Sequence, residues 1–183
     1  KVDPAIRGIQ PLDGEMGQGG RAIAHNGTLA NAVALGRRLG GRGSICQSSS
    51  DTECIIHMAA RIFEGSLIDR LQDALRKCEG AYSVVALTKD GLIGVRDPMG
   101  IRPLVLGKRD DAWILASETC ALDIVAAEYV RDVEPGEMIV ITDDGIESMA
   151  PFQSKPPRFC IFEYVYFSRP DSIIGDRSVY ETR

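Results

Sequence analysis

The sequence has no apolar run that approaches the roughly twenty residues required by a membrane-spanning helix. It also lacks a signal peptide, because Lys1–Pro4 does not open an apolar export segment. No basic run is present, and 21 Lys and Arg against 26 Asp and Glu give a formal net charge of −5. A face that binds nucleic acid needs the opposite balance. These absences predict a cytoplasmic protein with neither a membrane nor a nucleic acid among its partners.

Metal-binding patterns are also scarce. The chain has 2 histidines and 5 cysteines, and the cysteines are scattered without a CxxC pair. An odd number of cysteines in a chain without an export signal predicts reduced thiols rather than disulfides. Because no HExxH motif or Cys/His cluster occurs, we expect no complete metal site and no cofactor within this chain.

The remaining composition is typical of a globular protein, with 44% hydrophobic and 26% charged residues. A short strand is predicted at Arg21–Ala24, followed by an Asn-Gly turn. Thr28 would then cap a helix that runs to Gly40. These assignments place Asn26 and Gly27 on a loop between a strand and a helix.

Two further helices are predicted from capping boxes, in which an N-cap Ser is followed three positions later by an acidic residue. Ser50 and Glu53 form one such pattern, which places Asp51 at the start of a helix. Ser66 and Asp69 form the second, ahead of another amphipathic segment.

After Gly80 the pattern changes to short β-branched runs between turn residues, which predicts antiparallel strands and one short helix. The strands are expected at Tyr82–Leu87, Leu92–Val95, Leu104–Gly107, Trp113–Ala116 and Met138–Ile141, and the helix at Thr119–Ala127. Helices followed by strands, without βαβ alternation, predict the α+β class.

The segment Pro151–Pro157 is rich in proline and predicts a linker or a domain edge. We therefore divide the chain into a first domain at residues 1–157 and the beginning of a second at residues 158–183. Residues 1–20 predict a loop or an incomplete strand, so both ends of the chain are expected to be cut.

Asn26 and Gly27 have the chemistry of an oxyanion hole. Hydrolysis of an amide by a nucleophile creates a negative oxygen, and an Asn side chain beside a Gly N–H would supply two donors to it. Asn-Gly is also the commonest dipeptide of tight turns, so a plain turn is the alternative.

Asp51 could hold the ammonium group of a substrate, or it could simply favour the start of a helix through its negative charge. His25 is a candidate general base, with a packed histidine as the alternative. Cys54 is the best-placed thiol of the chain for a nucleophile, although a core thiol is the favoured interpretation.

A rigid, charged loop is predicted between strands at Val95–Leu104, where Arg96 and Arg102 occur with two prolines. The arginines could clamp an anion, or they could merely tie the loop down through their hydrogen bonds. The residues alone do not decide between these two roles.

Several longer segments of the sequence contain these candidate residues or follow them. They are Ile9–Pro11, Ala24–Leu29, Ser50–Glu53, Arg96–Gly107, Ala116–Asp123 and Cys160–Ser172. Together they resemble the glutaminase domain of the amidophosphoribosyltransferase family, a group of class II, N-terminal-nucleophile amidotransferases of purine biosynthesis. The resemblance covers nearly the whole chain.

The resemblance implies an αββα sandwich of two antiparallel sheets, incomplete here, followed by the start of a phosphoribosyltransferase domain. It implies that an N-terminal cysteine attacks glutamine, that Asn26 and Gly27 form the oxyanion hole, and that Asp51 pairs with the glutamine ammonium. The ammonia would pass to phosphoribosylpyrophosphate, giving 5-phosphoribosylamine, glutamate and pyrophosphate.

The chain departs from the family pattern in that neither the nucleophilic cysteine nor the upstream arginine segment has a counterpart, so we expect the chain alone to be inactive. Gly175-Asp176 also reverses the order expected in the family. The resemblance further implies magnesium for the missing transferase domain and homo-oligomers for the full-length protein. In some relatives a cysteine like Cys160 binds an iron-sulfur cluster.

Two other functions fit the same residues. One is another class II amidotransferase, such as those that form glucosamine phosphate or asparagine. The other is a non-catalytic module that keeps the fold without the nucleophile. The residues that follow Arg183 in the parent protein would separate the first alternative, and a cysteine encoded upstream of Lys1 would separate the second.

Overall fold

The structure is a computed structural model that describes residues 8–15, 20–62, 64–153 and 155–182. The chain divides into two compact units, Lys1–Ile93 and Gly94–Arg183, and each is described by itself. The helices and antiparallel strands of both units confirm the α+β class.

The first unit is built on the strands β1 (Leu12–Glu15), β2 (Gly20–Leu29), β3 (Gly80–Thr88) and the start of β4 (Gly91–Arg96), which follow one another in this order. β2 pairs antiparallel with β1 on one side and with β3 on the other. β2, which contains Asn26 and Gly27, is therefore flanked by another strand on each side along part of its length.

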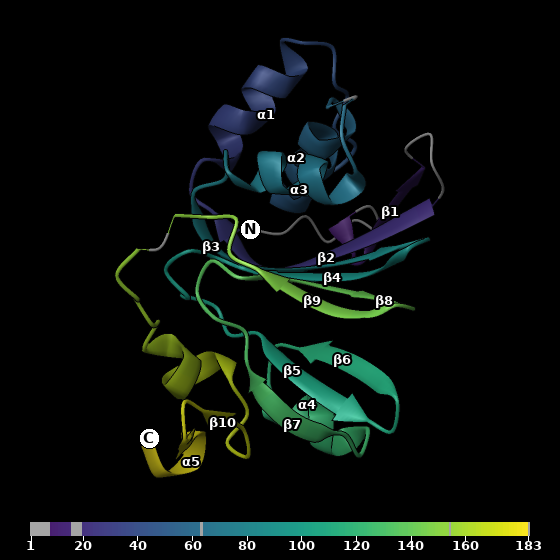
Figure 1. The fold of residues 1–183 in the computed structure, drawn as a ribbon. Helices are drawn as coiled ribbons and strands as arrows, with labels where there is room; N and C mark the ends of the chain where they lie inside the picture. The colour runs from purple at the N-terminus through teal and green to yellow at the C-terminus, as the bar shows by residue number, and fades with distance from the viewer. Residues whose placement is uncertain (1–7, 16–19, 63, 154, 183) are drawn as a thin grey trace. The chain divides into compact units, whose positions relative to one another are not determined.

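Three helices cover one face of these strands: α1 (Ala32–Gly40), α2 (Asp51–Ala60) and α3 (Leu67–Leu75). α2 contacts α1, α3 and β2, so it lies at the centre of the helical layer (Figure 1). Buried apolar side chains join the helices to the sheet, and they include Leu35, Leu39, Ile55, Leu71 and Val84. This packing holds the start of α2 against the end of β2.

The predicted turn at Asn26 and Gly27 is wrong. β2 continues to Leu29 because its last residues pair with the first residues of β3, with Gly27 opposite Tyr82. α1 begins only at Ala32, and Thr28 does not cap it. Pairing with a distant strand thus overrides the local turn preference of Asn-Gly.

The two predicted capping boxes differ in outcome. The Ser66 hydroxyl accepts a hydrogen bond from the Asp69 N–H, and the Asp69 carboxylate accepts one from the Ser66 N–H, which confirms the box at α3. Ser50 is the N-cap of α2, but its side chain makes no capping hydrogen bond. The carboxylate of Glu53 instead accepts from the preceding segment, so the box predicted at α2 is wrong.

Replacing Ser66 with alanine is expected to lower the free energy of unfolding by about 1 kcal/mol, because the α3 terminus loses its capping acceptor. Ser50→Ala is the matched control, since the Ser50 side chain caps nothing. Urea denaturation followed by circular dichroism measures both variants. Equal losses from the two serines would contradict the assignment.

The second unit contains a three-stranded sheet in the order β6-β5-β7, formed by β5 (Val105–Arg109), β6 (Ala112–Ala116) and β7 (Glu128–Asp132). Helix α4 (Thr119–Ile124) contacts β6 and β7, and Leu122 packs with Val105 in a small core. The end of β4 is followed in its sheet by β8 (Met138–Thr142) and β9 (Gly145–Met149), which form an antiparallel hairpin. Each predicted strand is present, but β7, β9 and two short strands after residue 170 were not predicted.

The charged loop after β4 is tied to the backbone of its own unit. The buried Arg96 guanidinium donates to the carbonyls of Arg102, Val133 and Gly100, and the Asp97 carboxylate accepts from the Met99 N–H. Arg102 forms an ion pair of 2.5 Å with the buried carboxylate of Glu163. Arg96 therefore ties the loop down through hydrogen bonds, whereas Arg102 pairs with an anionic side chain of the same unit.

The end of the chain forms a short π-helical turn, η2 (Glu163–Phe167), a two-stranded hairpin of β10 (Ile173–Ile174) and β11 (Arg177–Ser178), and α5 (Val179–Thr182). Gly175 and Asp176 both have positive φ and form the hairpin turn, which tolerates the reversed order of these residues. The domain boundary predicted at residue 157 stays a prediction, as does the start of a transferase domain.

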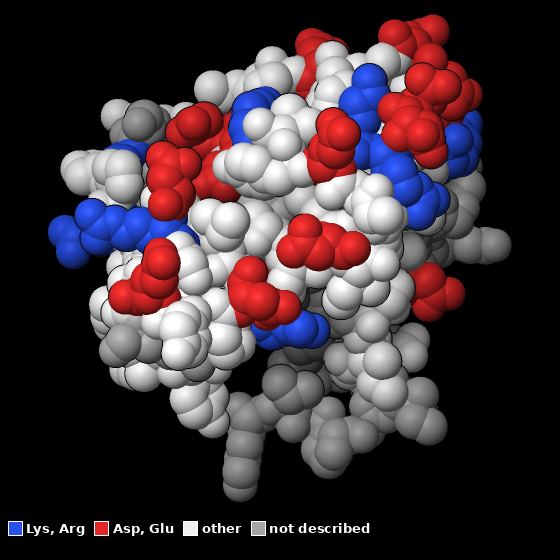
Figure 2. All heavy atoms as spheres, turned by 90° about the horizontal axis from the view of Figure 1, so that it is seen from below, with Lys and Arg blue, Asp and Glu red and all other residues white. Residues whose placement is uncertain are grey.

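No helix among the described residues is long and apolar enough to cross a bilayer. On the face shown in Figure 2, acidic and basic side chains are interspersed rather than separated into areas of one sign.

Candidate functional site

The candidate site lies where β2 extends past β1. β1 pairs only with the residues of β2 up to Ile23, so the later part of β2 has no strand partner on that edge among the described residues. His25, Asn26 and Gly27 all lie in this extension. The start of α2, which carries Asp51, packs beside it.

The hydrogen bonds of neighbouring residues reveal the direction of the Gly27 N–H. The His25 N–H donates to the side-chain oxygen of Gln10, and the Leu29 N–H donates to Asp51 Oδ2 at 2.8 Å. Both bonds point away from β3. Because backbone groups alternate along a strand with a period of two, the Gly27 N–H faces the same edge.

Gly27 also meets a steric requirement of the sheet. Its φ is 147°, and a Cβ added there would lie 2.0 Å from the Ala81 carbonyl oxygen of β3. No side chain fits at that distance, so glycine is required by the backbone as well as by any chemistry.

Asn26 and His25 point to opposite faces of β2, because successive side chains of a strand alternate. Asn26 is partly exposed, whereas His25 is buried beneath α2. The Nδ1 atom of His25 lies 3.3 Å from Thr52 Oγ1 and 3.4 Å from Asp51 Oδ1. Of the two interpretations of His25, the structure places it as a packed residue between β2 and α2.

Asp51 is the first residue of α2, and its side chain is 20% exposed. Burial disfavours its charged form, but hydrogen bonds from His25 and from the Leu29 N–H outweigh that effect and hold the pKa of Asp51 below its usual value. The carboxylate is therefore ionised at neutral pH and retains an exposed part.

Gly27 and Asp51 present two different kinds of group along this edge. The N–H groups of Gly27 and Leu29 are two residues apart along β2, a separation of about 7 Å. Asp51 is bound at the Leu29 end, and Gly27 supplies a donor at the other. The arrangement can bind an extended ligand that has an ammonium group at one end and a carbonyl oxygen at the other.

The thiols of the first unit do not have the character of a nucleophile. Burial raises the pKa of Cys54 to about 11 and that of Cys78 to about 12. Burial, together with the charge of Glu53, also raises the pKa of Cys46. A reactive cysteine needs the opposite shift, so Cys54 is better described as a core thiol.

Sequence reasoning missed one group of side chains. Cys46, Glu53 and His57 bring a thiol, a carboxylate and an imidazole within 4.8 Å of one another. The spacing of Glu53 and His57, four residues apart on one helix, could have indicated it. The position of Cys46 could not have been predicted, because it depends on the path of the segment that precedes α2.

The chain belongs to the glutamine amidotransferase domain family, because the sequence model of that family matches residues 1–123.

The particular relatives are amidophosphoribosyltransferases. The enzyme of Rhizobium etli is 52% identical over 98% of this chain, and that of Bacillus subtilis is 43% identical over 96%. The chain spans 37% of the length of each of these two relatives.

Solved structures agree with this assignment. The glutamine phosphoribosylpyrophosphate amidotransferase of B. subtilis, complexed with ADP and GMP, has a TM-score of 0.93 and 41% identity over 98% of this chain and 40% of that one. A class II glutamine aminotransferase domain protein of Silicibacter pomeroyi has a TM-score of 0.53 and 18% identity over 73% of this chain and 67% of that one, and it shares the fold alone.

Proposed function

We propose that this chain is the glutamine-binding and glutamine-hydrolysing part of an amidophosphoribosyltransferase. In the whole enzyme, ammonia released from glutamine would displace pyrophosphate from phosphoribosylpyrophosphate and give 5-phosphoribosylamine. The similarity to amidophosphoribosyltransferases over nearly the whole chain supports this assignment over the other class II amidotransferases.

The main support for this proposal is that Gly27 and Asp51 lie along the same edge of β2. Asp51 is held there by the Leu29 N–H, and Gly27 directs its own N–H to the same edge. Glutamine would bind with its α-ammonium at Asp51 and its side-chain carbonyl oxygen toward Gly27.

The oxyanion hole would consist of the Gly27 N–H and the side-chain amide of Asn26. Attack on the glutamine amide converts its carbonyl oxygen into an anion, and two preorganised donors stabilise that anion more than the neutral oxygen. The sheet fixes Gly27 in place before the reaction, so little reorganisation is needed when charge develops.

The resemblance to the family implies that the attacking thiol is an N-terminal cysteine of the whole enzyme, and we infer that the chain alone does not hydrolyse glutamine. In support, burial raises the pKa values of Cys46, Cys54 and Cys78, so these three thiols do not fit the role. The phosphoribosylpyrophosphate site, its magnesium and any homo-oligomer contacts belong to the whole enzyme in this proposal, which we place in the cytoplasm.

Asp51→Asn tests the proposal in a full-length enzyme that carries this segment. We expect the KM for glutamine to rise by about 10- to 100-fold, because hydrogen bonds to charged groups contribute about 1.5–3 kcal/mol. The kcat should change little, since the ammonium contact is present before and during the reaction. Steady-state measurement of glutamate release gives both constants.

Asp69→Asn is the matched control. Asp69 is also a carboxylate at the start of a helix, but its hydrogen bonds cap α3 through Ser66. Its replacement should leave the KM for glutamine unchanged. An unchanged KM in Asp51→Asn, or an equal rise in both variants, would contradict the proposed role.

A further inference from the structure

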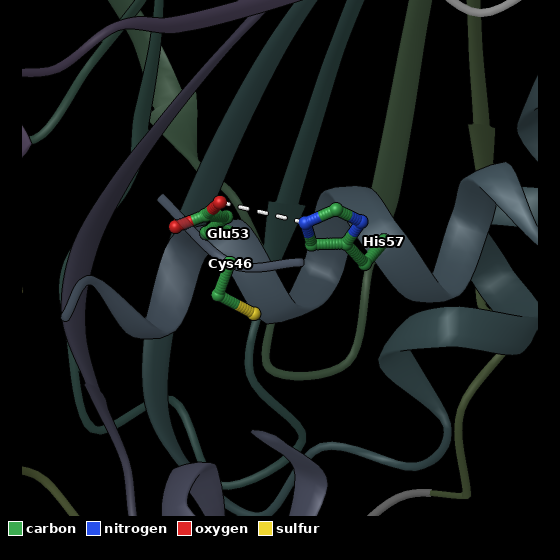
Figure 3. A group of neighbouring side chains, drawn as sticks. All are labelled: Cys46, Glu53 and His57. Atoms are coloured by element: carbon green, nitrogen blue, oxygen red, sulfur yellow. Dashed lines mark ion pairs between the residues drawn. The ribbon is translucent and has the colours of Figure 1, made fainter. Parts of the chain in front are cut away.

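Three side chains outside the glutamine site converge at the outer side of α2. Glu53 and His57 lie one turn apart on that helix, and Cys46 lies in the segment that precedes it. Figure 3 shows the Glu53 carboxylate and the His57 ring directed toward one another, with Cys46 beside them. A thiol, a carboxylate and an imidazole are the three ligand types that zinc prefers in proteins.

The separations suit one small ion. His57 Nε2 lies 3.4 Å from Glu53 Oε1. Ligand atoms of a tetrahedral zinc ion are about 3.3–3.7 Å apart, given bond lengths of about 2.0–2.3 Å. One ligand atom from each of the three residues lies within 4.8 Å of the other two, and Cys46 is exposed, so a shift of about 1 Å would complete the geometry.

The surroundings already orient the carboxylate. Glu53 accepts hydrogen bonds from the Gln47 N–H at 2.6 Å, from the Ser48 N–H at 2.8 Å and from the Ser48 hydroxyl at 2.7 Å. These contacts fix the residues that directly follow Cys46 against α2. Metal sites use such outer hydrogen bonds to orient their ligands.

We propose that Cys46, Glu53 and His57 bind a divalent transition-metal ion of the zinc class. The protein supplies three ligands, and water occupies the fourth position. The sulfur and nitrogen donors select zinc, cobalt or ferrous iron over magnesium and calcium, which prefer oxygen ligands. The Cys46 thiol loses its proton to solvent when the metal–sulfur bond forms.

The bound ion joins the segment before α2 to the helix itself. The segment and α2 meet at Ser50, next to Asp51. The metal thus stiffens the approach to the glutamine site without touching it, and its binding does not depend on the function proposed for that site.

Titration of the full 183-residue chain with Co²⁺ tests the proposal. A bound cobalt ion with a thiolate ligand gives a sulfur-to-metal charge-transfer band, and four-coordinate cobalt gives intense visible bands. We expect both to saturate at one equivalent and to disappear when Zn²⁺ is added.

Variants assign the ligands. Cys46→Ser should abolish the charge-transfer band, and His57→Ala should weaken cobalt binding by about 100-fold or more, beyond the loss seen when only an outer-shell partner is removed. Cys120→Ser is the control, because Cys120 lies in the other unit, and it should bind cobalt as the unchanged chain does. Circular dichroism confirms that each variant is folded.

Two results would overturn the proposal. One is a titration of the unchanged chain without a thiolate band, which would leave Glu53 and His57 as an ion pair on the helix surface. The other is a band that survives Cys46→Ser or is lost in Cys120→Ser, because the metal would then bind elsewhere.

Discussion

Asn26→Ala in a full-length enzyme that carries this segment is expected to lower glutamine-dependent synthesis by about 100- to 1000-fold, the usual effect of removing one oxyanion donor. Synthesis from free ammonia should be almost unchanged, because ammonia bypasses the tetrahedral intermediate that Asn26 would stabilise. The loss should appear in kcat, since the anion develops only in the transition state. Parallel assays with glutamine and with ammonium chloride measure the two activities.

Asn31→Ala separates a chemical effect from a structural one. The Asn31 side chain donates to the Lys77 carbonyl and accepts from the Glu79 N–H, so it braces the start of α1. Its loss should reduce stability but should not change the ratio of the two activities. If Asn26→Ala reduces both activities equally, the oxyanion assignment is wrong.

Gly27→Ala is expected to lower the free energy of unfolding by about 4 kcal/mol, the sum of about 1–3 kcal/mol for backbone strain and about 1–3 kcal/mol for overpacking. The added methyl group would lie 2.0 Å from the Ala81 carbonyl oxygen, which belongs to backbone that cannot rotate away. β2 and β3 would have to separate at the point where β2 carries the site. Urea denaturation of the 183-residue chain measures the change.

Gly40→Ala controls for the general effect of replacing glycine. Gly40 is helical, and a Cβ there would meet no atom within 4 Å. This variant should be as stable as the unchanged chain or slightly more stable, because alanine favours helix. A Gly27→Ala chain of ordinary stability would show that the close contact between β2 and β3 can relax.

The sequence predicts elements well where the signal is local. The capping box of Ser66 and Asp69 places α3 correctly because both partners lie within one turn. The predicted start of α2 is also correct, although Glu53 accepts hydrogen bonds from the preceding segment and forms no capping box with Ser50. A short-range pattern can therefore give the right boundary for the wrong reason.

Strands without a buried face are harder to predict. β7 and β9 expose most of their residues, so neither shows the alternation of apolar and polar side chains that identifies a strand. β9 is defined by pairing with β8, and β7 by pairing with β5. Such partners are visible only in the folded chain.

The candidate site could likewise be predicted only in part from the sequence. Asn26, Gly27 and Asp51 could be named from the sequence, but the turn predicted for the first two hid the role of the strand. The direction of the Gly27 N–H follows from bonds made by His25 and Leu29 to side chains far away in the chain. The chemical roles of these three residues stay predictions that the variants above test.

Asp51, the proposed partner of the glutamine ammonium, is held by the backbone N–H of Leu29. Its position therefore depends on the register of β2 against β3. A backbone N–H is present whatever side chain stands at position 29, so substitutions there can alter packing and still leave Asp51 in place. A slip of β2 by one residue against β3 would instead turn the N–H groups of His25, Gly27 and Leu29 toward β3 and remove both ends of the site together. We therefore expect glutamine binding to tolerate side-chain changes at position 29 better than insertions or deletions in β2.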